Sequence, residues 1–280
     1  MANAPMAHLL NDGETLPGIG FGTYPLRGED GTQAMVNALE NGYRYLDSAV
    51  NYQNEAEVGE ALRRSGLPRD DVRLATKIPG RLHAKDLALQ SLRDSAKRFG
   101  VDRIDVALIH WPNPSRRLYR QAWQALVEAQ REGLVRTIGV SNFTEEHLRI
   151  VIDDSGVTPA VNQVELHPYF PQAELRAVHE RLGILTQAWS PLGKNPSPFG
   201  EPPVVTAARG HDVSPARVVL RWHVQLGTMP LPKSANPQRQ RDNLDLDGFA
   251  LTDDEVASIS DLGRADGRRF GGDPDAHEEM

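Results

Sequence analysis

The length, composition and charge of the chain exclude several classes of protein. Its 280 residues, 39% of them hydrophobic and 25% charged, are typical of a globular protein with a large core. The formal charge of −7 argues against nucleic acid or an anionic membrane as the main partner.

The absence of cysteine excludes disulfides, cysteine metal sites and thiol catalysis, and it fits a reducing compartment. The first ten residues lack a basic start followed by a long apolar run. No apolar stretch approaches the roughly 18 residues that span a bilayer. We therefore expect a cytoplasmic protein without a metal site.

The chain begins with a hairpin signal. Asn11-Asp12-Gly13 lies between apolar pairs, so a β-hairpin is expected over residues 8–16. The following GIGFG resembles part of a dinucleotide-binding fingerprint, but the third glycine is missing at the required spacing. We interpret residues 18–22 as a short first strand.

Helical periodicity then alternates with short apolar, β-rich runs. The expected helices are 33–40, 54–64, 85–99, 118–132, 145–153, 172–181 and 215–225. The expected further strands are 43–46, 73–76, 104–109, 135–140, 160–164, 184–188 and 228–231. This alternation predicts parallel strands with crossover helices, and eight such strands favour an α/β fold of the closed (β/α)8 TIM-barrel type. The N-terminal hairpin would cap the bottom of the barrel.

The best alternative domain boundary is the proline-rich segment 191–203. It lies between the seventh and eighth expected strands, where a long βα loop explains it equally well. The sequence therefore predicts a single domain over residues 1–280.

Polar, chemically capable residues follow the expected strands. In GYRYLDSAVNY, Asp47 ends a strand and Tyr52 follows it, although taken alone Asp47 could cap the next helix and Tyr52 could pack on a surface. Loops at the carboxyl ends of barrel strands build active sites, so one site is indicated. Its candidates, each after a different strand, are Asp47, Lys77, His110, Asn142, Gln163, Trp189 and Lys233.

Several motifs show that the chain resembles the aldo-keto reductase family, and within it the bacterial 2,5-diketo-gluconic acid reductases. They cover nearly the whole chain: LNDGETLPGIGFGTY, GYRYLDSAVNYQNEAEVGEAL, ATK, DVALIHWP, TIGVSN, PAVNQVELHP, WSPLG and PKSANPQRQRDNLD. The resemblance implies NADPH-dependent reduction of aldehydes or ketones, with small or polar carbonyls, keto-sugars and dicarbonyls as substrates.

The resemblance assigns a catalytic tetrad to Asp47, Tyr52, Lys77 and His110. Tyr52 would donate the proton, although the reference pKa of a phenol is about 10. At ~4 Å and an effective dielectric of ~20, a Lys77 ammonium would attract a phenolate by about 4 kcal/mol, which is enough to lower its pKa by roughly three units. Asp47 would hold Lys77, and His110 would orient the carbonyl oxygen.

No side chain can donate a hydride, so a cofactor is required. The resemblance implies that the nicotinamide half is held by Ser141, Asn142, Gln163, Trp189, Ser190 and Leu192. It implies that the adenosine half is held by Lys233, Ser234, Arg239, Asp242 and Asn243. Asn236-Pro237 is a typical helix start, and its free backbone amides would also face the 2′-phosphate.

In the substrate pocket, the resemblance places Tyr24 and Trp111 as walls. Pro79 stands where relatives often carry tryptophan, and the chain ends soon after Arg268. These departures predict an open site that prefers small or polar carbonyls to steroids.

Two alternatives remain at this stage. Lys77 could form a Schiff base in a barrel aldolase, with Tyr52 as acid and base. The chain could also be a non-catalytic, NADPH-sensing subunit. A monomer is expected in each case.

Overall fold

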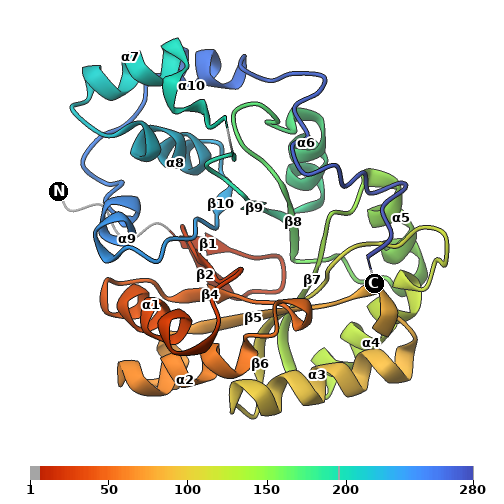
Figure 1. Ribbon diagram of the computed structural model, residues 1–280. Coiled ribbons are helices and arrows are strands. Elements are labelled where there is room, and N and C mark those ends of the chain that lie inside the picture. Colours follow the sequence, from red (N-terminus) through yellow and green to blue (C-terminus); the bar gives the residue numbers. More distant parts are fainter. Residues whose placement is uncertain (1–6, 195, 280) are drawn as a thin grey trace.

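The computed structural model describes residues 7–194 and 196–279. A parallel sheet of eight strands curls around a central axis in the sequential order β3 to β10 (Figure 1). The strands are β3 (Phe21–Gly22), β4 (Tyr45–Asp47), β5 (Arg73–Ile78), β6 (Ile104–Ile109), β7 (Val135–Ser141), β8 (Val161–Glu165), β9 (Leu185–Trp189) and β10 (Met229–Pro230).

The first and last strands of this sheet are joined by backbone hydrogen bonds, and in each of them the first strand region is the donor and the last is the acceptor. The amides of Gly20 and Gly22 donate to the carbonyls of Pro230 and Pro232 at 3.0 and 3.1 Å. Proline has no amide hydrogen, so Pro230 and Pro232 cannot donate in return. The predicted (β/α)8 barrel is confirmed, with this seam as its closure.

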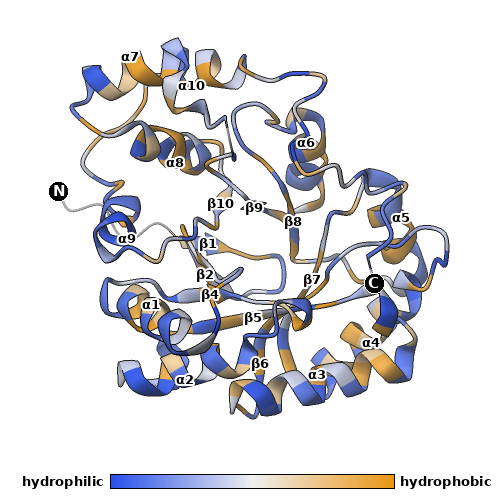
Figure 2. Cartoon of the chain, in the orientation of Figure 1, coloured by the Kyte–Doolittle hydropathy of each residue, from blue (hydrophilic) through white to orange (hydrophobic). Residues whose placement is uncertain are grey.

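The helices form the outer layer. They are α1 (Gly28–Glu40), α2 (Glu55–Ser65), α3 (Lys85–Phe99), α4 (Tyr119–Arg131), α5 (Glu145–Ser155), α6 (Ala173–Leu182), α7 (Pro202–Gly210), α8 (Pro215–Gln225), α9 (Pro237–Leu244) and α10 (Asp253–Ser260). Their hydrophobic faces turn inward and their hydrophilic faces outward (Figure 2). None of the described helices is long and apolar enough to cross a membrane.

Two helices were not predicted from the sequence. The segment 191–203 was interpreted as a loop, but its last two residues, both proline, begin α7, where a missing amide hydrogen costs nothing. Helix α10 begins at a capping box in which Thr252 and Glu255 each bond the backbone of the other.

The N-terminal hairpin closes the lower end of the barrel, as predicted. Strands β1 (Ala7–Leu9) and β2 (Thr15–Pro17) pair antiparallel. Leu10 and Leu16 are buried among the side chains of the barrel interior. Asn11 Nδ2 donates to Pro159 O at 3.1 Å, just before β8 begins.

Helices α2 and α3 approach very closely at Gly59. A Cβ atom built on Gly59 would lie 2.1 Å from the carbonyl oxygen of Phe99, so no larger residue fits without movement. Glycine permits this backbone contact.

After α10 the chain crosses the carboxyl end of the barrel. It passes α6 and α5 and its last described residues lie near α4 (dark blue, Figure 1). Arg264 N donates to Tyr169 O at 3.1 Å, and the Phe270 ring packs edge-on against Trp189 at 5.0 Å. This tail thus borders the end of the barrel where the site was predicted.

Candidate active site

A cavity of about 860 Å³ opens at the carboxyl ends of the strands. Twelve of the predicted site residues line it: Tyr24, Asp47, Tyr52, His110, Trp111, Ser141, Asn142, Gln163, Trp189, Ser190, Leu192 and Lys233. Phe270 and Lys194 also line it, although neither was predicted as a site residue.

Asp47 and Lys77 form a buried ion pair at the ends of β4 and β5. Lys77 Nζ lies 2.6 Å from Asp47 Oδ2 and donates to Ser48 O at 2.9 Å. Burial is the largest influence on the pKa of Lys77 and lowers it, but Asp47 and Tyr52 together raise the pKa above its usual value. Lys77 therefore stays charged in a fully buried position.

Tyr52 ends a 3-10 helix, Val50–Tyr52, directly over this pair. Lys77 Nζ lies 4.9 Å from the centroid of the Tyr52 ring. The following Asn54 is buried and fixes this turn, because it accepts from Ser48 Oγ at 2.6 Å and donates to Leu26 O at 2.9 Å.

The expected net lowering of the Tyr52 pKa is wrong. Burial raises the pKa of the phenol above its usual value, and Lys77 offsets only part of that rise. The carboxylates of Asp47 and Glu279 raise it further. Tyr52 is thus held in its protonated form, the form that a proton donor needs.

His110 follows β6, and its ring lies 5.7 Å from that of Tyr52. Its carbonyl accepts from Asn142 Nδ2 at 3.0 Å. Its Nδ1 lies 2.7 Å from Oε1 of Glu279, a residue that the sequence analysis missed. No local pattern indicates this contact, since Glu279 reaches the site from the far end of the chain.

Asn142 orients the ring that was predicted to face the nicotinamide. It adopts a left-handed conformation with φ 62°. Its Oδ1 accepts from Trp189 Nε1 at 2.8 Å, and its Nδ2 also donates to Ser141 Oγ at 3.0 Å. All polar atoms of the Asn142 side chain are thereby engaged within the protein.

Gln163 offers an acceptor for a carboxamide. Its Nε2 donates to Asp47 Oδ1 at 2.9 Å and to Gln187 Oε1 at 3.1 Å. Neither bond uses the other amide atom, Oε1. Within the described residues, that oxygen accepts no hydrogen bond. This oxygen of Gln163 therefore fits the amide hydrogens of a nicotinamide, whereas Ser141 Oγ already donates to Gln163 O at 2.8 Å and can only accept.

The predicted phosphate site lies around the start of α9. Lys233 and Arg239 are exposed, and neither forms an ion pair with any residue that the structure describes. Ser234 is mostly buried. These features fit an anionic group bound at the surface.

The expectation of free backbone amides at this helix start is wrong. Asn236 Oδ1 accepts from the amides of Gln238 and Arg239 at 2.9 and 3.1 Å, and Pro237 has no amide hydrogen. A phosphate would depend on side chains instead.

The remaining predicted residues lie outside the main cavity. Asp242 Oδ1 accepts from Gln238 Nε2 at 2.7 Å, and Asn243 is buried. Pro79 is buried and directly precedes the 3-10 helix Gly80–Leu82, and it is not among the residues that line the cavity. Their roles toward cofactor and substrate stay predictions.

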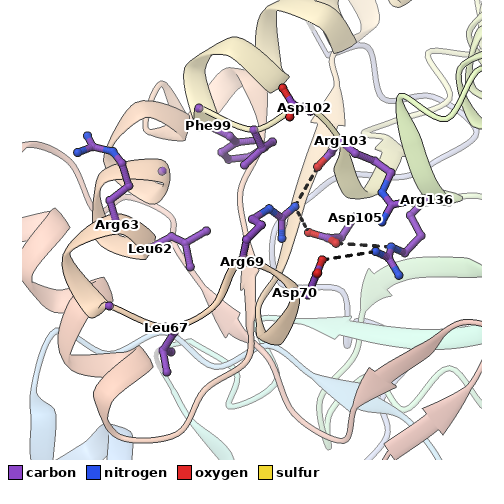
Figure 3. A pocket seen from close by; sticks show the side chains of 14 residues that line it. Leu62, Arg63, Leu67, Arg69, Asp70, Phe99, Asp102, Arg103, Asp105 and Arg136 are labelled. Carbon is purple, nitrogen blue, oxygen red and sulfur yellow. Dashed lines mark hydrogen bonds and ion pairs between the residues drawn. The ribbon is translucent and has the colours of Figure 1, made fainter.

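A second cavity, of about 570 Å³, lies at the opposite end of the barrel (Figure 3). Arg69 Nη2 lies 2.6 Å from Asp105 Oδ2, which also accepts from Leu74 N at 2.9 Å. Arg136 Nε lies 3.8 Å from Asp105 Oδ1. This charged cluster ties together the starts of β5, β6 and β7, where barrels carry structural contacts.

No group of three or more potential metal ligands occurs among the residues that the structure describes. The donors around the main cavity are amides, hydroxyls and cations, which suit a phosphate-bearing organic cofactor.

The chain belongs to the Aldo/keto reductase family, whose sequence profile matches residues 18–196 and 202–264. It is 55% identical over 280 residues, all of both chains, to 2,5-diketo-D-gluconic acid reductase B of Corynebacterium sp. (strain SHS752001). It is 39% identical over 276 residues, 98% of each chain, to a methylglyoxal reductase of Escherichia coli.

Among solved structures, a mutant of Gox0644 in complex with NADPH superposes with a TM-score of 0.93 at 38% identity, covering 99% of this chain and 100% of that one. The protein is thus an NADPH-dependent oxidoreductase that reduces carbonyl compounds. Neither a Schiff-base aldolase nor a cofactor-sensing subunit finds support among these relatives.

Proposed function

We propose that Asp47, Tyr52, Lys77 and His110 perform this reduction on small, polar carbonyl compounds, with keto acids and dicarbonyls preferred. The observation that carries the proposal is the Lys77–Asp47 pair buried directly behind Tyr52, with His110 beside it on the cavity wall.

When bound, NADPH supplies the hydride that the carbonyl carbon accepts. The Tyr52 hydroxyl gives its proton to the carbonyl oxygen, and the charged Lys77 beneath it stabilises the phenolate that results. Asp47 keeps Lys77 charged and in place. His110 contacts the carbonyl oxygen and orients it toward Tyr52.

We further propose that the cofactor lies along the cavity, with its nicotinamide at one end and its adenosine at the other. Ser141 and Gln163 bind the carboxamide, and Trp189 with Ser190 and Leu192 forms the wall beside the nicotinamide. At the other end, the 2′-phosphate is bound by Lys233, Ser234 and Arg239, and the adenine lies against Asp242 and Asn243.

The charges on the cavity wall favour neutral or anionic substrates. Asp47 is the single acidic residue among the lining residues, and its charge is compensated by Lys77. Lys194 lies on the wall, with Nζ 5.1 Å from the centroid of the Phe270 ring. The names of the two relatives, a diketo-gluconic acid reductase and a methylglyoxal reductase, support the same class.

Aromatic walls limit the size of the substrate. The ring centroids of Tyr24 and Tyr52 are 5.1 Å apart, and those of Trp111 and His277 of the tail are 4.2 Å apart. A Cβ atom on Gly272 would lie 2.4 Å from the Trp111 ring, so the tail holds this wall in place.

A substrate panel tests this proposal through the loss of NADPH absorbance. We expect methylglyoxal and a 2,5-diketo acid to have a higher kcat/KM than a steroid ketone. Efficient turnover of the steroid, with poor turnover of the small dicarbonyls, would refute the substrate class.

Tyr52→Phe is the control for the chemistry in the same panel. Loss of general acid catalysis typically costs about 10² to 10⁴-fold in kcat, and binding of NADPH should change little because the ring is kept. Retention of most of the activity would show that Tyr52 is not the proton donor.

We also propose that the chain is one domain and acts as a monomer in the cytoplasm. One continuous barrel and the lack of a long polar linker support the first point. The absence of cysteine from the sequence is compatible with a reducing compartment.

A further inference from the structure

The last described residues are docked at the edge of the active site. Asn113 Nδ2 donates to the backbone oxygen of Glu279 at 2.6 Å, and Ser115 N donates to Glu278 Oε1 at 2.8 Å. The His277 ring contacts Trp111. Three successive residues of the tail are therefore fixed by the loop that follows β6.

The Glu279 carboxylate lies against His110 and Asn51. Asn51 donates a hydrogen bond to it, whereas His110 Nδ1 lies within ion-pair distance but its N–H is not aligned with the carboxylate oxygen. Its Oε1 lies 2.7 Å from His110 Nδ1 and accepts from Asn51 Nδ2 at 2.8 Å, and Asn51 directly precedes Tyr52. Burial raises the pKa of Glu279, but His110, Asn51 and Gly80 together outweigh burial and lower it below the usual value. Glu279 is therefore ionised near neutral pH.

Glu279 does not obstruct the site. His110 is among the residues that line the main cavity, whereas Glu279 is not. The carboxylate thus lies behind the imidazole, which leaves the other ring nitrogen, Nε2, for the cavity side.

We propose that Glu279 is a positioning residue for His110, whose Nδ1 it keeps protonated and whose ring it fixes so that Nε2 meets the substrate oxygen. This inference rests on the proposed role of His110 in binding the carbonyl. It assigns a function to the tail beyond forming a wall of the pocket.

The protonation state of His110 determines how the ring can bind the substrate. With a proton on Nδ1, a neutral imidazole can only accept a hydrogen bond at Nε2. The ring donates to a carbonyl oxygen only when Nε2 is protonated as well, and the Glu279 carboxylate compensates the resulting positive charge. Removing that carboxylate should weaken carbonyl binding without affecting the cofactor.

Other charged groups surround this pair. Lys77, Asp47 and Glu279 all act on the charge of Tyr52. Glu279, Arg116 and Glu278 all act on that of His83. His83 stays neutral near pH 7, because burial lowers its pKa to about 4. The Glu279 charge raises the pKa of Tyr52, so its removal should shift the alkaline loss of reduction to lower pH.

The ¹⁵N spectrum of the imidazole rings tests the protonation state directly. The signals of His110 are assigned by their loss in His110→Asn. We expect a protonated Nδ1 in the unmodified protein near pH 7, and a changed Nδ1 signal in Glu279→Gln. A His110 ring protonated at Nε2 alone would overturn the inference, whatever the kinetics show.

Kinetics of Glu279→Gln supply the second readout, with Glu278→Gln as the matched control, since it makes the same change one residue away on an exposed side chain. We expect Glu279→Gln to raise the KM for the carbonyl about tenfold, to leave the Kd for NADPH unchanged and to move the alkaline limb to lower pH. Equal KM values and pH profiles in the two variants would contradict the inference. Failure of the proposed role of His110 would instead show in His110→Asn, as a KM for the carbonyl equal to that of the unmodified protein.

Discussion

At the scale of single residues, Lys233 and Arg239 are cations without an anionic partner in the described chain, and Asn236 occupies the amides at the start of α9. Phosphate recognition then depends on side-chain charge. A charge-assisted hydrogen bond contributes about 1.5 to 3 kcal/mol, so Arg239→Ala should raise the Kd for NADPH by about tenfold to over a hundredfold and change that for NADH little. Quenching of tryptophan fluorescence measures both constants.

The matched control for this prediction is Arg241→Ala on the same helix. Arg241 donates to Gln238 Oε1 on its own helix at 2.8 Å and to Asn41 Oδ1 at the end of α1 at 3.3 Å, so its guanidinium is already engaged within the protein. We expect Arg241→Ala to leave the Kd for NADPH unchanged. An equal loss of affinity in both variants would mean that only the general charge of the surface matters.

The predictable part of the site consists of residues that follow strands. Asp47, Lys77 and His110 could be placed together because parallel strands bring their carboxyl ends to one end of the barrel. The tail contacts could not, since Asn113 and Glu279 are 166 positions apart and no periodicity relates them. The Tyr52 pKa was mispredicted because pairwise attraction was weighed without the cost of burial.

At the scale of elements, the close approach of α2 to α3 at Gly59 should be the most sensitive point of the helical layer. Gly59→Ala adds one methyl group against the Phe99 carbonyl, and overpacking of this kind typically costs about 1 to 3 kcal/mol. We expect the free energy of unfolding in urea to fall by that amount.

Gly210→Ala, at the end of α7, is the control, because nothing lies within 4 Å of a Cβ atom there. Alanine favours the helical conformation, so this variant should be unchanged or stabilised by up to about 1 kcal/mol. If both variants were equally stable, the two helices would have room to separate.

The order of the elements was predictable because periodicity changes sharply between strand and helix. Helix α7 was missed because prolines, which end a helix pattern in its interior, here begin one. Helix α10 was missed although Thr252 and Glu255 form a capping box. It follows the last strand of the barrel, where strands and helices no longer alternate.

At the scale of the whole molecule, three buried histidines link stability to pH. Burial lowers the pKa of His83 and His179 to about 4 and that of His223 to about 3. The unfolded chain binds these protons first, near the ordinary value of 6.5. Stability is therefore present above that value and is lost as pH falls from it toward 3 to 4.

At pH 5 we expect the free energy of unfolding to be lower than at pH 7.5 by about 2 kcal/mol for each of these histidines. Urea unfolding at the two pH values measures it. Carboxylates titrate mostly below this window, near pH 4, and so contribute little to the difference. A free energy of unfolding that stays constant from pH 7.5 to pH 5 would show that these rings are charged in the folded state.

The seam between β3 and β10 couples the integrity of the barrel to the molecule bound above it. Tyr24 follows β3 on one side, and Lys233 follows β10 on the other; both line the main cavity. The seam itself holds by bonds donated from one side only. A ligand that contacts the residues following both strands bridges this junction. Because such a ligand binds only the closed barrel, the free energy needed to open the barrel rises with the occupancy of the site.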